Sequence, residues 1–304
     1  MRLLKTSLLA LAISMPLFSV PTIATAQSSL EKAFIAKSRL SSSIWKKHNP
    51  NSNAVVDHSA WDQFLSKYTR RNGQGVNLVA YGSVSSADKK SLQAYLNNLQ
   101  ATDVTKLNRN EQYAFWLNLY NASTVNLGIK NFPLNSILDI KSNPLDLKGP
   151  FNDNVAKVNG KKLTLDTIES GIVRPIWNDP RLHYAFNCAA ISCPNLGSKA
   201  YKGATINAQL NAAAKAYVND PRGIRIRNGE ITASKIYFWY SDDFGKNEKA
   251  VLAHIKKFGS AKLKAALDGK TKINSYEYDW ALNKQYVSGT MGAWLLARVL
   301  KNML

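Results

Sequence analysis

The residues best suited to chemistry lie in one short stretch, Arg181 to Leu196, which reads RLHYAFNCAAISCPNL. It contains both cysteines of the chain, Cys188 and Cys193, and one of the four histidines, His183. A thiol near an imidazole can act as a nucleophile with its general base. Two thiols this close together can equally form a disulfide that shapes a loop. The spacing alone leaves both chemistries open.

A catalytic thiol needs a lowered pKa, which an imidazolium or a helix N-terminus can provide. If residues 183–186 form a strand and a helix starts near Ala189, Cys188 would lie at the helix start, where backbone N–H groups could also hold an oxyanion. On one extended strand, five residues would separate His183 from Cys188 by roughly 16 Å, which is too far for contact. The nucleophile hypothesis therefore requires a turn between the two residues, or another base.

The N-terminus predicts export, which bears on the disulfide hypothesis. Arg2 and Lys5 precede an apolar run from Leu8 to Val20, and Ala24–Ala26 is an A-x-A cleavage site that would leave Gln27 as the first mature residue. This is the pattern of a secretory signal peptide, and no later stretch approaches the roughly 20 apolar residues of a spanning helix. We expect a protein of the periplasm or, alternatively, of the extracellular space, where an isolated pair of cysteines commonly forms a disulfide.

A long helix is predicted from about Arg109 to Lys130, with Asn108 as its N-cap. Within this aromatic-rich segment, Glu111, Asn118 and Asn121 recur at spacings that place them on roughly one face. A polar stripe on a buried helix must be hydrogen-bonded and often faces a site. The simpler interpretation is a solvent-facing stripe with a helix cap. Glu111 or Asp243, which follows an aromatic run, could orient an imidazole.

Several common site signatures are missing from the chain. The sequence contains no zinc-protease, nucleophile-elbow, phosphate-loop or dinucleotide-binding motif, so no cofactor is predicted. The cysteines with one nearby histidine are too few for a structural zinc site, so no metal is predicted. His48, His58 and His254 have no ligand-like neighbour at useful spacing, and each is expected at the surface.

Periodicity and turn signals predict one α+β domain, with a helical N-terminal half and antiparallel hairpins in the second half. The hairpins are predicted around Asn159-Gly160 and Asn228-Gly229, because these dipeptides suit two-residue turns. The predicted strands are 76–81 and 276–280. Further helices are predicted at about 30–39, 59–68 (capped by Ser59), 86–99 (capped by Ser86), 166–174, 205–218, 248–257 and 260–267. The predicted organisation is a signal peptide (1–26), an N-terminal extension (27–58), the α+β domain (59–284) and a C-terminal amphipathic helix (285–304, helical from about 289).

The formal net charge is +20, and loss of the signal peptide would leave +18. In an exported protein, this excess favours anionic lipid headgroups, acidic glycans or cell-wall polymers over nucleic acid as partners. A solvated basic surface that only maintains solubility is the alternative. The positive residues are scattered in short pairs and form no single run, so the sequence defines no specific anion site. The pairs are Lys46-Lys47, Arg70-Arg71, Lys161-Lys162 and Lys256-Lys257.

Four motifs occur in an order that resembles the bacterial branch of domain of unknown function family 547. They are NEQYAFWLNLYNA (110–122), HYAFNCAAISCP (183–194), FWYSDDF (238–244) and YDWALN (278–283). With their flanks they cover most of the chain from about residue 60 to residue 283.

One activity compatible with the resemblance is that of a cysteine-dependent, papain- or transglutaminase-like hydrolase or acyltransferase, acting on an amide or thioester. Such an assignment would make Cys188 the nucleophile and His183 the general base, with Glu111, Asn118 or Asp243 as supporting polar groups. Thiol hydrolases usually draw cysteine and histidine from distant parts of the chain, so the five-residue spacing departs from their pattern. The alternative is a non-catalytic envelope protein with a disulfide-shaped loop and a basic surface that binds an anionic glycan or a protein partner.

Overall fold

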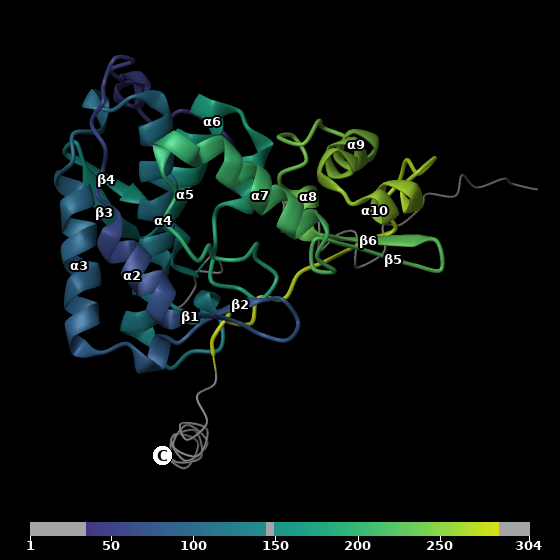
Figure 1. The fold of residues 1–304 in the computed structure, drawn as a ribbon, viewed down its shortest axis with the longest axis horizontal. Coiled ribbons are helices and arrows are strands. Elements are labelled where there is room, and N and C mark those ends of the chain that lie inside the picture. The colour runs from purple at the N-terminus through teal and green to yellow at the C-terminus, as the bar shows by residue number, and fades with distance from the viewer. Residues whose placement is uncertain (1–34, 144–148, 286–304) are drawn as a thin grey trace, which may run out of the picture. The chain divides into compact units, whose positions relative to one another are not determined.

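Helix α4 (Arg109–Asn131) is the central element of the described structure. The computed structural model describes residues 35–143 and 149–285, of which all but Ile35 belong to the unit Ala36–Leu304 (Figure 1). The predicted N-cap is confirmed, since the Asn108 side chain accepts a hydrogen bond from the Glu111 backbone N–H at 3.0 Å. The signal peptide and the C-terminal helix predicted from the sequence lie outside the described residues.

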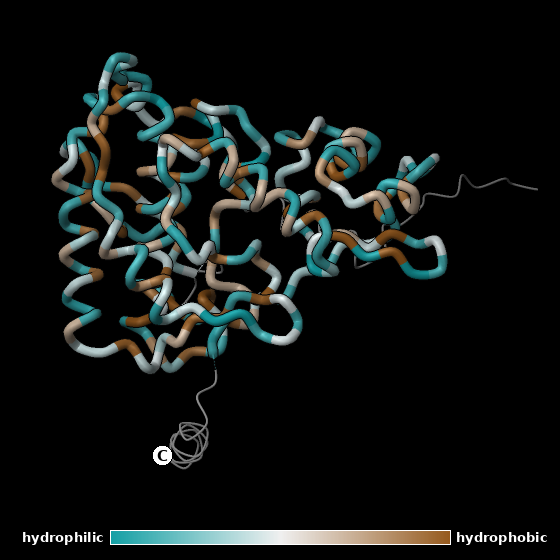
Figure 2. Tube along the Cα trace, in the orientation of Figure 1, coloured by the Kyte–Doolittle hydropathy of each residue, from teal (hydrophilic) through white to brown (hydrophobic). Residues whose placement is uncertain are grey.

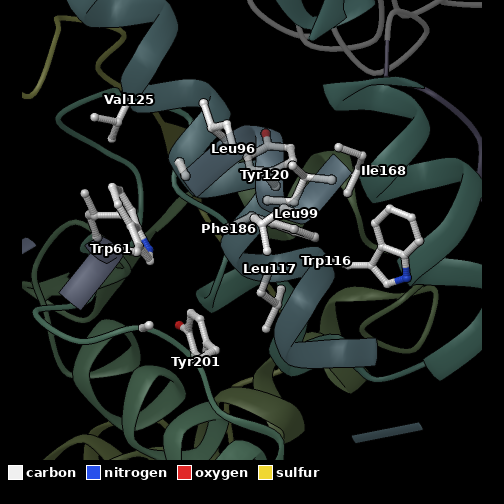
Figure 3. Packing of buried hydrophobic residues seen from close by; sticks show 14 of the residues in the cluster. Trp61, Leu96, Leu99, Trp116, Leu117, Tyr120, Val125, Ile168, Phe186 and Tyr201 are labelled. Atoms are coloured by element: carbon white, nitrogen blue, oxygen red, sulfur yellow. The ribbon is translucent and has the colours of Figure 1, made fainter. Parts of the chain in front are cut away.

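Two amphipathic helices flank α4: α3 (Ser86–Ala101) packs against α4, and α2 (Ser59–Tyr68) packs against α3 (Figure 1). Both helices bury one apolar face, and hydrophobic and hydrophilic residues recur along each of them (Figure 2). Figure 3 shows side chains of α4 among residues of the helices and loops around it. The buried residues labelled there are Trp61, Leu96, Leu99, Trp116, Leu117, Tyr120, Val125, Ile168, Phe186 and Tyr201.

The hairpins predicted in the second half are confirmed. Strand β3 (Asn154–Val158) pairs antiparallel with β4 (Lys161–Thr164), and β5 (Ile224–Arg227) pairs antiparallel with β6 (Glu230–Ser234). Both turn residues have positive φ in each hairpin, at 45° and 76° in Asn159-Gly160 and at 50° and 79° in Asn228-Gly229. Asparagine and glycine tolerate this left-handed conformation best, which is why these dipeptides direct the turns.

The remaining strands are short. β1 (Thr69–Arg71) and β2 (Asn77–Val79) form a third antiparallel pair. β2 lies within the strand predicted at 76–81, whereas β1 was not predicted. β7 (Ser275–Glu277) runs parallel to β6 and makes that sheet mixed, a pairing that the hairpin signals do not indicate. The predicted α+β class is thus confirmed, with small sheets beside a predominantly helical body.

The predicted helix 166–174 is divided into three parts. α5 (Leu165–Ile168) continues into a π-helical turn, η6 (Glu169–Val173), and then into α6 (Arg174–Trp177). The widened turn brings Gly171 against an extended segment, where Arg39 and Ser41 donate backbone hydrogen bonds to the Ser170 and Gly171 carbonyls. Residues 35–39 are therefore not helical, which corrects the described part of the helix predicted at 30–39.

Three later helices follow the predictions closely: α7 (Ile206–Val218), α9 (Glu248–Phe258) and α10 (Ala261–Ala266). The aromatic run forms a further short helix, α8 (Lys235–Trp239), that the sequence analysis did not predict. Short 3-10 turns connect the elements: η1 (Ser43–Lys46), η2 (Tyr81–Ser83), η3 (Val104–Lys106), η4 (Ile137–Asp139), η5 (Gly149–Asn152), η7 (Pro180–Tyr184) and η8 (Gly203–Thr205).

Two predicted caps are displaced by one residue. Ser85, and not Ser86, caps α3 by accepting from the Asp88 backbone N–H. Ser59 is the first residue of α2, and the Asp57 carboxylate accepts from its backbone N–H. Across the described part of the chain, no helix combines the length and the apolar character that crossing a membrane requires.

Candidate functional site

The sequence-predicted residues His183 and Asp243 are in direct contact. The 3-10 turn η7 ends at Tyr184 and carries His183, whereas Asp243 follows α8. The His183 Nε2 atom lies 2.7 Å from Asp243 Oδ2, and the ring stacks on Tyr240 with its centroid 4.0 Å away. Tyr240, at the end of the aromatic run, thus stacks on the imidazole, and Asp243, three residues later, is the acceptor for its N–H.

Arg174, which the sequence analysis did not single out, completes this arrangement from the start of α6. Its Nε and Nη2 atoms lie 2.6 and 3.1 Å from the two carboxylate oxygens of Asp243. Its Nη1 atom donates to the Ala36 carbonyl at 2.8 Å and to Ser170 Oγ at 3.0 Å. Burial alone would raise the pKa of Asp243, but the hydrogen bonds from His183 and Arg174 outweigh it and hold the pKa well below its usual range.

Burial also keeps His183 neutral. It lowers the pKa of the imidazole to about 4, although the hydrogen bond to Asp243 opposes the change. Because Asp243 is ionised, the neutral ring donates its Nε2–H to that carboxylate. The other ring nitrogen, Nδ1, lies 3.7 Å from Glu169 Oε1.

Glu169 is a buried carboxyl at the start of the π turn η6. Burial raises its pKa from 4.5 to about 7, and the charge of Arg174 only partly opposes this. The hydroxyls of Tyr120 and Tyr240 interact with this carboxyl, and the interaction with Tyr240 opposes the rise in its pKa less than burial promotes it. Two carboxyl groups with oppositely shifted pKa values therefore flank one imidazole, an arrangement able to hold and move a proton.

The two cysteines form a disulfide, which decides the pairing that the sequence left open. The Cα atoms of Cys188 and Cys193 are 6.2 Å apart, and neither residue is a free thiol. The hydroxyl of Tyr278 lies 3.0 Å from the Cys188 sulfur and 3.1 Å from the Cys193 sulfur. Cys188 is half-buried and Cys193 is buried.

The disulfide loop differs from the nucleophile geometry considered for the sequence. Residues 180–184 form a 3-10 turn and not a strand, and Ala189 has a φ of 63° instead of starting a helix. Cys188 therefore does not lie at a helix N-terminus. The His183 ring nitrogens face Asp243 and Glu169, so neither nitrogen is directed at the Cys188 sulfur.

The polar stripe of α4 is buried and hydrogen-bonded, which corrects the solvent-facing interpretation. Asn118 donates to the Tyr201 carbonyl at 2.8 Å and accepts from the Tyr201 N–H at 3.0 Å. Asn121 donates to the Ala185 carbonyl at 2.9 Å and accepts from the Asn187 N–H at 2.8 Å. Each asparagine side chain donates one hydrogen bond to the backbone of a loop and accepts one from it, as the backbone of a neighbouring strand would. Asn121 thereby positions the backbone between His183 and Cys188.

Glu111 serves another part of the chain. Its Oε1 atom accepts from the Val56 N–H at 2.8 Å, and η8 passes so close that a Cβ on Gly203 would lie 2.8 Å from the Glu111 backbone. This carboxylate ties two segments to the start of α4, whereas His183 donates its hydrogen bond to Asp243. Of the predicted site residues, the structure thus brings His183 and Asp243 together and gives Glu111 and Asn118 backbone partners elsewhere.

The family comparison covers this part of the chain. Residues 104–218 match the family described as "Protein of unknown function, DUF547". The matched segment holds α4, Glu169, Arg174, His183 and the disulfide loop, whereas Asp243 and Tyr278 lie beyond it. No curated protein and no solved structure matches the chain.

Within the DUF547 match, sequence reasoning missed Glu169 and Arg174, because each stands in an ordinary short helix pattern without a motif. Tyr278, beyond the match, was visible as the first residue of the YDWALN motif. The described residues contain no group of three histidine, cysteine or acidic residues that could hold a metal ion.

Two of the three histidines predicted at the surface are not exposed, which corrects that prediction. His58 is buried with its Nδ1 atom 2.7 Å from the Tyr95 hydroxyl, and His254 is half-buried among aromatic rings.

Proposed function

We propose that this protein is a non-catalytic protein of the cell envelope, exported through its signal peptide to the periplasm, which binds an anionic glycan or a protein partner. The observation that carries the proposal is the Cys188–Cys193 disulfide beside an imidazole whose ring nitrogens both face carboxyl groups. Thiol catalysis needs a thiolate and a base within hydrogen-bond reach of each other. The four sequence motifs support its assignment to the bacterial exported branch of the DUF547 family.

The disulfide loop is built as a fixed structural unit. Asn121 and Asn187 hold its start, and Arg222 donates to the Ile191 and Cys193 carbonyls at 2.8 and 3.2 Å. An oxidising compartment preserves such a bridge. The net charge of the exported chain, +18 without the signal peptide, supports an anionic partner, because it raises the local concentration and the association rate of polyanions.

Iodoacetamide labelling followed by mass spectrometry tests this proposal. The native, non-reduced protein is labelled in one sample, and a sample treated with dithiothreitol is labelled in parallel. We expect both cysteines to be alkylated only after reduction. Alkylation of Cys188 in the native, non-reduced protein would contradict the structural role of the bridge.

A second candidate is a thiol enzyme that becomes active after reduction, as a hydrolase or acyltransferase on an envelope amide or thioester. It is favoured by the Tyr278 hydroxyl, which lies within hydrogen-bond distance of both sulfurs, and by the half-exposed position of Cys188. A dithiol reductant would supply two electrons and two protons, break the S–S bond and leave two thiols. The hydroxyl could then stabilise a thiolate on Cys188.

The pH dependence of alkylation separates the two candidates. In the reduced protein, an activated Cys188 would react with iodoacetamide with an apparent pKa well below that of Cys193, and Tyr278→Phe would raise it toward the ordinary value of about 8.5. Equal alkylation profiles for the two thiols, unchanged in Tyr278→Phe, would exclude the enzyme hypothesis. If the profile does indicate an activated thiol, Cys188→Ala should abolish hydrolysis of a thioester probe by the reduced protein.

A further inference from the structure

The excess of basic over acidic residues is larger in one segment than in the chain as a whole. Residues 245–272 contain eight lysines but only two acidic residues, compared with 40 basic and 20 acidic residues in the whole chain. All of these lysines except the half-buried Lys256 are exposed. The set, called the lysine-rich segment below, comprises Lys246, Lys249, Lys256, Lys257, Lys262, Lys264, Lys270 and Lys272.

The fold brings the parts of this segment together. Lys256 at the end of α9 pairs with Asp268 after α10 at 3.1 Å, an exposed ion pair that links the two helices. Lys270 donates to the Gly229 carbonyl in the β5–β6 turn at 3.1 Å. The Asn274 side chain and backbone also bond to Ile231 of β6. The turn of this hairpin is hydrophilic (Figure 2).

The apolar residues of the segment point inward and leave the lysines outside. α9 buries Val251, Leu252 and Ile255, whereas Lys249 and Lys257 are exposed, eight residues apart and thus on one face. Lysine ammonium groups on flexible stems act as mobile point charges and do not demand the planar geometry that an arginine fork does. Such a surface suits a ligand with repeated anionic groups better than one anion in a fixed geometry.

The surroundings favour a hydrophilic polymer over a membrane or a protein. A helix that enters a lipid surface presents large apolar side chains, and the core of a protein interface is enriched in aromatic residues. Among the described residues, the large hydrophobic side chain that is exposed is Val55, which precedes α2 and is not part of the lysine-rich segment. An acidic polysaccharide can bind through its anionic groups to exposed lysines, without apolar contacts.

We propose that the lysine-rich segment is the binding surface for an acidic polysaccharide that carries carboxylate or phosphate groups. This inference rests on the proposed function and locates its ligand. Binding is electrostatic, releases counterions and weakens steeply with salt. The sign and density of the charge, and not a particular sugar, determine which polymers bind.

The test compares two charge reversals that are equal in size. Lys262→Glu with Lys264→Glu changes α10, and Lys89→Glu with Lys90→Glu changes α3, where both lysines are also exposed. All four lysines are exposed on helix surfaces, where substitutions change stability little, so both proteins should fold. Thermal unfolding of each variant checks this.

Binding is measured for alginate oligomers, which carry carboxylates, and for polyphosphate, with neutral dextran as the blank. Titrations at several salt concentrations give the affinity and its salt dependence. We expect the α10 pair to weaken binding on the order of tenfold and to reduce the salt dependence, whereas the α3 pair changes both much less. The polymer that binds more tightly identifies the anionic group.

Each failure has a distinct meaning. If the wild-type protein binds neither alginate nor polyphosphate, the anionic-glycan function itself fails. If it binds but both variant pairs weaken binding equally, net charge alone is responsible and the surface assignment is overturned. If it binds vesicles of phosphatidylglycerol and phosphatidylcholine but neither polymer, the polysaccharide is the wrong partner.

Discussion

The asparagines of α4 show how one polar residue can organise a buried loop. Asn121 offers both a donor and an acceptor to the backbone on the two sides of Phe186. An unpaired backbone group inside a protein costs free energy, so such a loop can be buried only if a side chain satisfies it. The sequence places Asn118 and Asn121 on one helix face, but it contains no information about which distant backbone they bind.

Asn121→Ala should therefore be much more damaging than its size suggests. The substitution leaves the Ala185 carbonyl and the Asn187 N–H buried without a partner, and we expect the free energy of unfolding to fall by about 3 kcal/mol. Asn131→Ala on the same helix is the matched control, because Asn131 is exposed and bonds only to the preceding turn. Urea unfolding of both variants measures the difference; equal losses would contradict the assigned role of Asn121.

Among the elements, those fixed by local residue preferences were predictable. α4 follows from its cap and its apolar interior, and the two Asn-Gly hairpins follow from residues that tolerate positive φ. The π turn η6 was not predictable, because its carbonyl groups accept hydrogen bonds from residues 39 and 41, which are distant in the sequence. The same limit applies to the site: His183 and Asp243 lie 60 residues apart, and no local pattern shows that α8 returns to η7.

The π turn has a measurable effect because it holds Glu169 in the core. The pKa of this carboxyl is about 7 in the folded protein and 4.5 as the ordinary value. Between these pH values the folded state keeps a proton that the unfolded state has released, so the contribution of Glu169 to stability falls as pH rises through 7.

Glu169→Gln removes this titration and retains an acceptor for the Tyr120 and Tyr240 hydroxyls. We expect the variant to gain stability relative to wild type between pH 5 and pH 8, by up to about 3 kcal/mol. Urea unfolding of both proteins at the two pH values measures the change. A stability difference that does not vary with pH would show that Glu169 is not protonated in the fold.

At the scale of the whole molecule, the buried imidazoles oppose this trend at lower pH. Burial lowers the pKa of His58, His183 and His254 to about 4 in each case, from the ordinary value of 6.5. Below pH 6.5 these imidazoles become protonated in the unfolded state but stay neutral in the folded state. The stability contributed by these residues is present above pH 6.5 and is lost as pH falls toward 4, at most about 3 kcal/mol for each histidine.

His254→Phe tests this account without touching the site around Asp243. His254 stacks on Tyr184 and contacts the rings of Phe244 and Phe258, so a phenyl ring fits the same aromatic surroundings. We expect the variant to lose up to about 3 kcal/mol less stability than wild type between pH 7 and pH 4, when urea unfolding is compared at both values. Glu169 reduces the slope above pH 4.5 equally in both proteins, so it cancels in the comparison. An unchanged acid loss in His254→Phe would mean that this imidazole is protonated in the folded protein, and that its aromatic surroundings do not exclude the charge.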